Sequence, residues 1–239
     1  MMIFQLARVL LLPVLVVQGI RVKRGIQKLP EAGGDRSGVF GTGVKIKLLI
    51  IGDSAAAGVG ANTQQQALSG RLVAALGSSC EVWWKLLARS GHASAQVLAR
   101  LQTAPAENFD FVVVSVGVND VTAQTGAKEW SANLKSIIDL LKSKFHSRHI
   151  VLSGLPPMHL FPGLPQPLRW WLGLRAKMLN ALMQEAVSDD SECTFLAIAF
   201  PVDRNFMAED GIHPGEPAYA LWGEEIAKVL QTKLGLVDG

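Results

Sequence analysis

The amino-acid sequence predicts an α/β protein in which a mainly parallel sheet is covered by helices on both faces. Five short runs of apolar and β-branched residues alternate with segments in which apolar residues recur at helical spacing. Parallel strands need long crossover connections, which are usually helices, so this alternation favours a layered α/β domain. With 239 residues, of which 49% are apolar and 18% charged, the chain is large enough to bury one such core.

The predicted elements follow one another regularly from residue 45 onward. The expected strands lie at residues 45–51, 81–87, 111–115, 149–153 and 193–198. The expected helices lie at residues 67–76, 95–101, 130–141, 169–187 and 217–234. Several polar motifs come directly after strands, and reactive groups collect at the carboxyl ends of parallel strands. The catalytic groups are therefore expected in the segments that follow the strands.

The first 28 residues form a separate apolar segment with a basic end. Residues 9–20 are apolar apart from Pro13, Gln18 and Gly19, which is shorter than the roughly 20 residues that cross a membrane. The segment ends in a cluster of cations: Arg21, Lys23, Arg24 and Lys28. Three interpretations stay open: a membrane-associating helix on the cytoplasmic side, an uncleaved or atypical signal sequence, and a helix packed on the domain. A cytoplasmic or membrane-associated protein is favoured, with export as the alternative.

Two further features bound the organisation and the partners. Residues 29–43 are rich in glycine and polar groups and predict a linker, so that residues 44–239 form the domain. The net charge is only +3, and no basic stripe with interleaved aromatic residues is present, so we expect no nucleic-acid partner. Cys80 and Cys193 form no CxxC pair and cannot build a metal site by themselves.

The first motif with chemical content is Gly-Asp-Ser-Ala-Ala-Ala-Gly at residues 52–58. Ser54 follows the first strand, beside a glycine that permits a sharp turn. A serine hydroxyl becomes a nucleophile when a base lies within hydrogen-bond reach, so Ser54 is a candidate nucleophile. The alternative is a serine that caps the N-terminus of a helix.

A carboxylate and an imidazole lie three residues apart in Asp-Gly-Ile-His-Pro, at residues 210–214 ahead of the last helix. In a turn the two side chains can approach each other on one side. Asp210 would then accept a hydrogen bond from Nδ1 of His213 and leave Nε2 to take a proton from a serine. The alternative is a capping aspartate beside a surface histidine.

Two more motifs offer hydrogen-bond donors at the same sheet edge. Asn119 lies in Gly-Val-Asn-Asp after the third strand, and Gly91 lies in Arg-Ser-Gly-His after the second. An asparagine amide or a backbone N–H can stabilise the oxyanion of acyl transfer. Taken alone, the asparagine motif also fits an ordinary Asx-turn.

Taken together and in this order, the four motifs resemble the SGNH (GDSL-type) serine esterase and lipase family. The resemblance runs from about residue 45 to residue 230 and implies a three-layer α/β/α, flavodoxin-like fold with five parallel strands in the order 2-1-3-4-5. It implies that Ser54, Asp210 and His213 are the catalytic triad, and that Ser54, Gly91 and Asn119 form the oxyanion hole. It requires neither a metal nor another cofactor. An α/β-hydrolase is disfavoured, because its nucleophile lies in Gly-x-Ser-x-Gly.

The expected function is that of an ester hydrolase, of the esterase, lysophospholipase or thioesterase kind, acting on a small-molecule acyl ester. An acyltransferase with the same triad is the alternative, and a non-catalytic binding protein on this scaffold is disfavoured. The segment at residues 155–171 is unusually apolar for a loop, which predicts a wall for an acyl chain or, alternatively, a loop packed on its helix or on the N-terminal segment. The expected wall residues are Met158, Leu160, Phe161 and Trp170.

Overall fold

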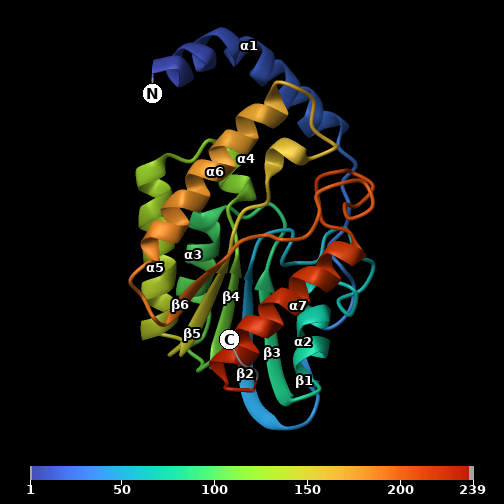
Figure 1. The fold of residues 1–239 in the computed structure, drawn as a ribbon, viewed down its shortest axis with the longest axis vertical. Coiled ribbons are helices and arrows are strands. Elements are labelled where there is room, and N and C mark those ends of the chain that lie inside the picture. The colour runs from blue at the N-terminus through green and yellow to red at the C-terminus, as the bar shows by residue number, and fades with distance from the viewer. Residues whose placement is uncertain (1, 237–239) are drawn as a thin grey trace.

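The computed structural model describes residues 2–236, with side chains from residue 11 onward. A central sheet lies between two layers of helices (Figure 1). The α2 and α7 helices pack together on one face, and α3, α5 and α6 pack in sequence on the other. This arrangement confirms the predicted three-layer α/β/α fold.

The sheet contains the five predicted parallel strands in the predicted order, together with a sixth strand that the sequence pattern does not reveal. The order along the sheet is β1-β3-β2-β4-β5-β6, so the parallel strands follow 2-1-3-4-5 when β1 is set aside. The parallel strands are β2 (Val44–Gly52), β3 (Cys80–Ala88), β4 (Phe111–Ser115), β5 (His149–Ser153) and β6 (Cys193–Leu196). All residues of β4 and β5 are buried, as expected for strands covered on both faces.

The extra strand, β1 (Ser37–Phe40), lies inside the segment predicted to be a linker. It pairs antiparallel with β3, with Ser37 opposite Lys85 and Phe40 opposite Val82. The strand is exposed along its whole length, so it lacks the buried apolar run that identified the other strands. The structure therefore corrects the expected strand count from five to six and shows that part of residues 29–43 belongs to the sheet.

The five predicted helices are present, with ends shifted by a few residues. They are α2 (Leu68–Leu76), α3 (Ser94–Thr103), α5 (Ala127–Ser143), α6 (Leu168–Ala186) and α7 (Glu216–Lys233). Two short elements were not predicted, because each is too short to show helical periodicity: α4 (Val118–Ala123) and the 3₁₀ turn η1 (Met158–Leu160).

The N-terminal segment is helical, as α1 (Met2–Gly25), and lies across the end of α6 (Figure 1). Among residues 11–236, whose side chains the structure describes, no helix has the length and apolar character needed to span a membrane. Leu15 of α1 is buried, and Gln18 exchanges two hydrogen bonds with the segment ahead of α6. The helix therefore packs on the domain along one of its sides.

The register of the parallel strands brings their carboxyl ends to one level. Gly52, the last residue of β2, is paired with Ala88 of β3 on one side and with Ser115 of β4 on the other. Ser115 is in turn paired with Ser153 of β5. The segments that carry the predicted motifs consequently leave the sheet side by side.

Candidate active site

Ser54 lies in a tight turn immediately after β2. Gly52 has a φ of +154°, and a Cβ atom there would lie 2.0 Å from the carbonyl oxygen of Ser115, so only glycine fits between the strands. No helix begins at Ser54, because residues 53–60 form turns and the next helix starts at Leu68. The alternative role of Ser54 as a helix cap is therefore not supported.

Asp210 and His213 lie in a narrow loop ahead of α7. The N–H of Ala208 donates to the carbonyl of His213 at 2.8 Å, and the N–H of Gly215 donates to that of Phe206 at 2.7 Å, which closes the loop on itself. The N–H groups of Ile212 and His213 both donate to Oδ1 of Asp210, at 2.9 and 3.0 Å. The carboxylate is thus fixed by the turn that follows it.

The structure brings the three predicted triad residues together. Nδ1 of His213 lies 2.5 Å from Oδ2 of Asp210, and Nε2 of His213 lies 3.0 Å from Oγ of Ser54. The Asp210 side chain is fully buried, whereas 23% of the His213 side chain is exposed. Burial acts to raise the pKa of Asp210, but the hydrogen bonds from His213 outweigh it, so the pKa lies below its ordinary value. Asp210 is therefore an ionised acceptor for the imidazole at neutral pH.

Helix α7 fixes the distance between the serine turn and the histidine loop. The hydroxyl of Tyr219, which is fully buried in α7, donates to the carbonyl of Val59 at 2.7 Å. A Cβ atom at Gly60 would lie 2.2 Å from the carbonyl oxygen of Pro214, so the two loops are in direct contact. Tyr219 is a positioning residue that none of the four motifs contains.

The candidate oxyanion donors lie on the two loops that flank the serine turn. Asn119 is in α4, and its Nδ2 donates to the carbonyl of His92 at 3.0 Å, which ties the loop after β4 to the loop after β3. An amide nitrogen carries two protons, so this bond leaves one for another acceptor. Gly91 is exposed, and nothing lies within 4 Å of the position of a Cβ atom there.

Buried acids hold these loops. Asp120 accepts hydrogen bonds from the N–H and the hydroxyl of Ser94, at 2.8 and 2.6 Å, and so joins α4 to the start of α3. Asp53 accepts a hydrogen bond from the N–H of Ala55 at 3.1 Å. Desolvation by burial raises the pKa of Asp53 to about 7. Asp53 is thus neutral in a large share of the molecules near pH 7.

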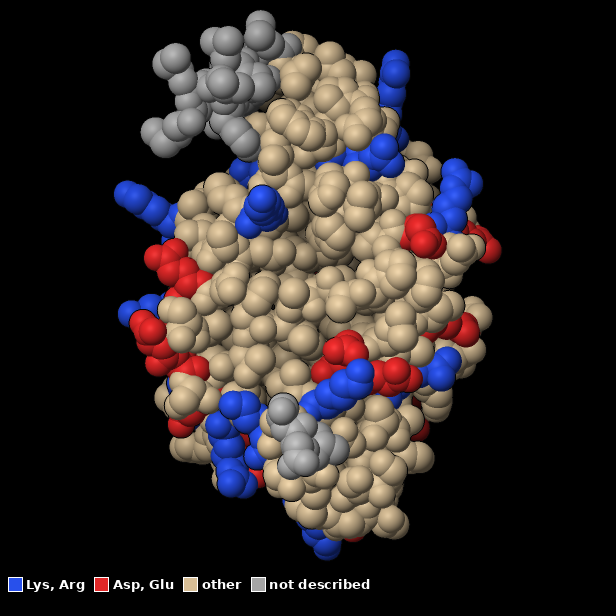
Figure 2. All heavy atoms as spheres, in the orientation of Figure 1, with Lys and Arg blue, Asp and Glu red and all other residues tan. Residues whose placement is uncertain are grey.

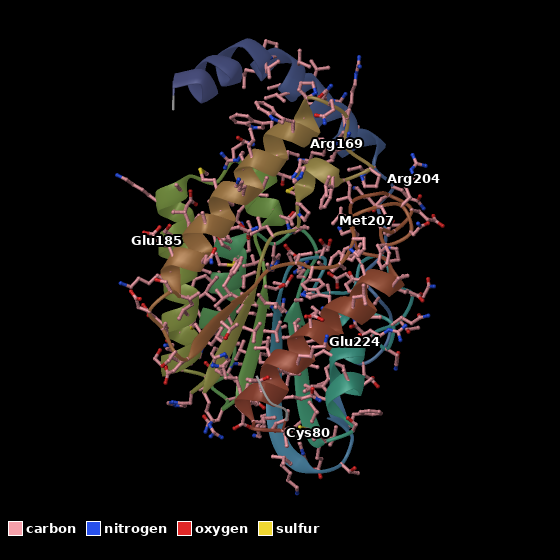
Figure 3. The ribbon with its side chains drawn as sticks, in the orientation of Figure 1. Cys80, Arg169, Glu185, Arg204, Met207 and Glu224 are labelled. Atoms are coloured by element: carbon pink, nitrogen blue, oxygen red, sulfur yellow. The ribbon has the colours of Figure 1, made fainter. Side chains whose placement is uncertain are left out.

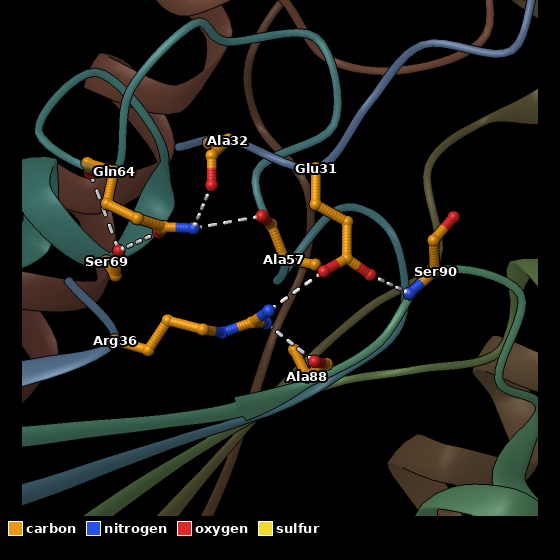
Figure 4. A network of polar contacts seen from close by, with 8 residues as sticks. All are labelled: Glu31, Ala32, Arg36, Ala57, Gln64, Ser69, Ala88 and Ser90. Atoms are coloured by element: carbon orange, nitrogen blue, oxygen red, sulfur yellow. Dashed lines mark hydrogen bonds and ion pairs between the residues drawn. The ribbon is translucent and has the colours of Figure 1, made fainter. Parts of the chain in front are cut away.

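The segment at residues 29–43 also supports the site, through the contacts shown in Figure 4. One carboxylate oxygen of Glu31 accepts the N–H of Ser90 at 2.6 Å, and the other binds Arg36 at 2.8 Å. Burial acts to raise the pKa of Glu31, but the Ser90 N–H and the Arg36 guanidinium hold it below its ordinary value. Gln64 donates to the carbonyls of Ala32 and Ala57, both at 3.1 Å.

An apolar pocket opens beside Ser54 and His213, between the ends of β4 and β5 and the loop ahead of α7. Met207 lines the pocket from that loop (Figure 3). On another wall, Nε1 of Trp222 in α7 donates a hydrogen bond to Oγ of Ser153 at 2.8 Å. The apolar side chains of the wall are Ala55, Val116, Val118, Leu155, Pro156, Phe161, Ile198, Phe200, Met207, Ile212, Pro214 and Trp222.

Of the four wall residues expected from the sequence, only Phe161 lines this pocket. Met158 is buried inside η1, whereas Leu160 and Trp170 are 48% and 39% exposed on the outer surface. These three side chains do not line this pocket, since the chain turns at η1 and α6 starts at Leu168. Ile198, Phe200, Ile212 and Trp222 were missed, because they come from irregular loops and from α7 and converge only in the folded chain.

Among residues 2–236, no group of three or more His, Cys, Asp or Glu side chains is placed to hold a metal ion. His149 is buried at the start of β5, where its Nε2 lies 2.9 Å from the hydroxyl of Thr194.

Solved structures with this fold include several esterases. A carbohydrate esterase family 2 enzyme of Corynascus thermopiles (Myceliophthora fergusii) aligns with a TM-score of 0.63 and 16% identity, over 81% of this chain and 68% of that chain. TesA aligns with a TM-score of 0.60 and 22% identity, over 80% and 99%. The esterase EstA of Pseudoalteromonas sp. aligns with a TM-score of 0.59 and 19% identity, over 79% and 98%. At these identities the likeness establishes the fold alone.

The family of the chain follows from a sequence model. No curated protein sequence matches the chain significantly. The model of the GDSL-like Lipase/Acylhydrolase family matches residues 50–221, a stretch that runs from β2 into α7 and contains all four motifs of the candidate site. The chain therefore belongs to the GDSL-like Lipase/Acylhydrolase family, whose members are hydrolases that act on esters.

Proposed function

We propose that the protein is a serine hydrolase that cleaves acyl esters through an acyl-serine intermediate. The observation that carries the proposal is the chain of contacts from Ser54 through His213 to Asp210, at 3.0 and 2.5 Å. Distances of this size place a base within reach of a serine proton and fix the orientation of that base. The family match supports ester hydrolysis as the reaction class.

In the first half of the reaction, Oγ of Ser54 attacks the ester carbonyl as Nε2 of His213 removes its proton. Asp210 accepts the hydrogen bond from Nδ1–H, which favours the imidazole tautomer with a free Nε2 and stabilises the imidazolium that forms. The N–H groups of Ser54 and Gly91, together with Nδ2 of Asn119, stabilise the negative charge on the carbonyl oxygen. The tetrahedral intermediate collapses to the acyl-serine as the imidazolium gives its proton to the leaving alcohol.

In the second half, water replaces the alcohol. His213 removes a proton from the water as its oxygen attacks the acyl-serine carbonyl, and returns the proton to Oγ when the acid leaves. Adding an acceptor alcohol such as butanol distinguishes hydrolysis from acyl transfer. A hydrolase releases mainly the free acid, whereas a transferase releases mainly the butyl ester.

The apolar pocket supports an aliphatic acyl group as the part of the substrate that binds beside Ser54. Its walls hold mainly apolar and aromatic side chains, and the hydroxyl of Ser153 on one wall accepts a hydrogen bond from Trp222. Burial of each methylene group contributes about 0.8 kcal/mol, so a chain that fills the pocket binds more tightly than acetate. A structural neighbour, the family two carbohydrate esterase of Clostridium thermocellum, is in complex with cellohexaose, whereas the lining of this pocket favours a less polar substrate.

The first experiment is hydrolysis of p-nitrophenyl esters from acetate to palmitate by the wild type and by Ser54→Ala. We expect kcat to fall on the order of 10⁴-fold or more in the variant, because no other group replaces the attacking oxygen. Ser188→Ala is the matched control and should retain full activity, because Ser188 is exposed after the end of α6 and does not line the pocket. Equal activity in the wild type and in Ser54→Ala would contradict the proposal.

Asn119→Ala tests the oxyanion hole separately. We expect kcat to fall by about 10²–10³-fold with little change in KM, because the lost donor acts mainly on the transition state. Asn119 also bonds the carbonyl of His92, so the melting temperature of the variant must be measured alongside. An unchanged kcat would remove Asn119 from the mechanism.

A further inference from the structure

Helix α1 has one side that packs on the domain. Leu15 is buried, and Leu11 and Val22 are packed partly against the core. Nε2 of Gln18 donates to the carbonyl of Gln166 at 2.7 Å, and Oε1 of Gln18 accepts the N–H of Leu168 at 3.0 Å. These contacts fix which side of the helix points away from the protein.

The opposite side of α1 is apolar and exposed. At about 100° per residue, its side chains cover roughly half of the circumference of the helix. We call this the outward face; it consists of Leu12, Val14, Val16, Val17 and Ile20, which are 44–50% exposed. A continuous apolar surface of this kind on a folded domain usually marks a site of contact with a partner.

The charge around the outward face is of one sign. Residues 1–30 contain Arg8, Arg21, Lys23, Arg24 and Lys28 and no aspartate or glutamate. Residues 154–184, which include the part of α6 beneath α1, also contain no acidic residue. In Figure 2 the α1 end of the molecule is tan and blue, and Figure 3 places Arg169 at the end of α6 beneath α1. A partner for this end of the molecule must be apolar and negatively charged.

We propose that the outward face of α1 docks onto an anionic lipid surface. A helix that is held on a folded domain by one side, with an exposed apolar face and cations at its end, can lie in the plane of a membrane with its apolar side chains among the acyl chains and its cations at the headgroups. Lying flat agrees with the packing of α1 on α6.

A second copy of the chain fits this face less well. Two copies joined through their outward faces would bring both basic clusters together with no acidic residue among residues 1–30 to neutralise them. Anionic headgroups supply the missing negative charge. Lipid binding by α1 does not depend on the ester chemistry, so the two proposals can fail independently.

The test is flotation of the full-length protein with vesicles of phosphatidylcholine, and with vesicles of an equal mixture of phosphatidylcholine and phosphatidylglycerol. We expect at least about tenfold stronger binding to the mixed vesicles, decreasing with added salt, because each cation near an anionic surface contributes favourably. Combined Arg21→Gln, Lys23→Gln and Arg24→Gln substitutions should remove this preference. Equal binding to both vesicle types would overturn the anionic component of the proposal.

The outward face itself is tested with Val16→Glu combined with Ile20→Glu. We expect about tenfold or greater loss of binding to mixed vesicles with unchanged esterase activity on a soluble ester, because no α1 residue lines the pocket. The matched control is Val39→Glu with Val44→Glu, which are 50% and 48% exposed on the sheet. Undiminished binding in the α1 variant, or no binding by the wild type, would overturn the proposal. So would a lipid-free dimer of the wild type that the α1 variant abolishes.

Discussion

A contact between Gly163 and Gly211 joins the segment between η1 and α6 to the loop that carries Asp210. The N–H of Gly163 donates to the carbonyl of Gly211 at 2.9 Å. A Cβ atom at Gly163 would lie 2.3 Å from the carbonyl oxygen of Asp210 and 3.0 Å from that of Gly211. The backbone at Gly163 therefore packs directly against the backbone of the Asp210 loop, and the contact leaves no room for a side chain at residue 163.

Gly163→Ala should displace the turn at Asp210 and lower kcat by roughly tenfold to 10²-fold, because a shift of about 1 Å in a catalytic group can cost that much. Overpacking should also lower the free energy of unfolding by about 1–3 kcal/mol. The measurements are kcat and KM on a soluble ester and urea unfolding at neutral pH. Gly19→Ala is the control, since nothing lies within 4 Å of a Cβ atom there. If both variants keep the wild-type kcat, the contact does not position Asp210.

At the scale of single residues, the sequence predicted the contacts among Ser54, Asp210 and His213 far better than it predicted the walls of the pocket. Ser54, Asn119 and His213 lie in compact motifs that follow strands or precede a helix, so their meeting at one sheet edge follows from the topology. The pocket walls have no such motif. Ile198 and Met207 lie in irregular segments, and only the tertiary fold directs them toward Ser54.

At the scale of elements, the segment at residues 29–43 acts as a brace for the loop after β3. Glu31 binds the N–H of Ser90, the residue before the candidate oxyanion donor Gly91. Arg36 binds Glu31 and also donates to the carbonyl of Ala88 at 2.6 Å, at the end of β3. A substitution in residues 29–43 that breaks these contacts should therefore shift the loop after β3, which carries Gly91, and leave Ser54, Asp210 and His213 in place.

Glu31→Ala should lower kcat by about tenfold, with a smaller effect on KM, because the loop that carries Gly91 loses a charge-assisted hydrogen bond. Such a bond contributes about 1.5–3 kcal/mol where it is shielded from water, and less at a partly exposed site. Glu107→Ala is the matched control, because it breaks a 2.8 Å ion pair with Lys85 away from the site. Equal losses of kcat in the two variants would show that Glu31 has no special role.

This brace could not be foreseen from the sequence. Its contacts join residues separated by 59 and 52 positions in the chain, through side chains that bind backbone groups. Such contacts leave no periodic pattern, and the Gly-rich composition of the segment favoured a linker. The five buried strands, in contrast, were recognisable because long apolar runs have few alternatives in an α/β chain.

At the scale of the whole molecule, the two ends of the sheet have different roles. Ser54, Gly91 and Asn119 follow the carboxyl ends of β2, β3 and β4, whereas His149 lies among buried neighbours at the amino end of β5. Desolvation lowers the pKa of His149 to about 4, and Lys233 and Lys142 act in the same direction. Asp190 and Glu192, which also face it, act in the opposite direction and do not compensate.

The low pKa of His149 predicts that acid destabilises the fold. In the unfolded chain His149 binds a proton near pH 6.5, whereas in the folded chain its pKa is about 4. The contribution of neutral His149 to the free energy of unfolding is therefore complete above pH 6.5 and is lost as the pH falls from 6.5 to about 4. With about 1.4 kcal/mol for each pKa unit of difference, the loss in free energy of unfolding approaches roughly 3 kcal/mol. Urea unfolding of the wild type and of His149→Gln measures it, and the variant should show a flatter pH dependence. His159→Gln, which removes an exposed imidazole, should retain the wild-type slope. Parallel pH profiles for the wild type and His149→Gln would place the acid sensitivity elsewhere in the molecule.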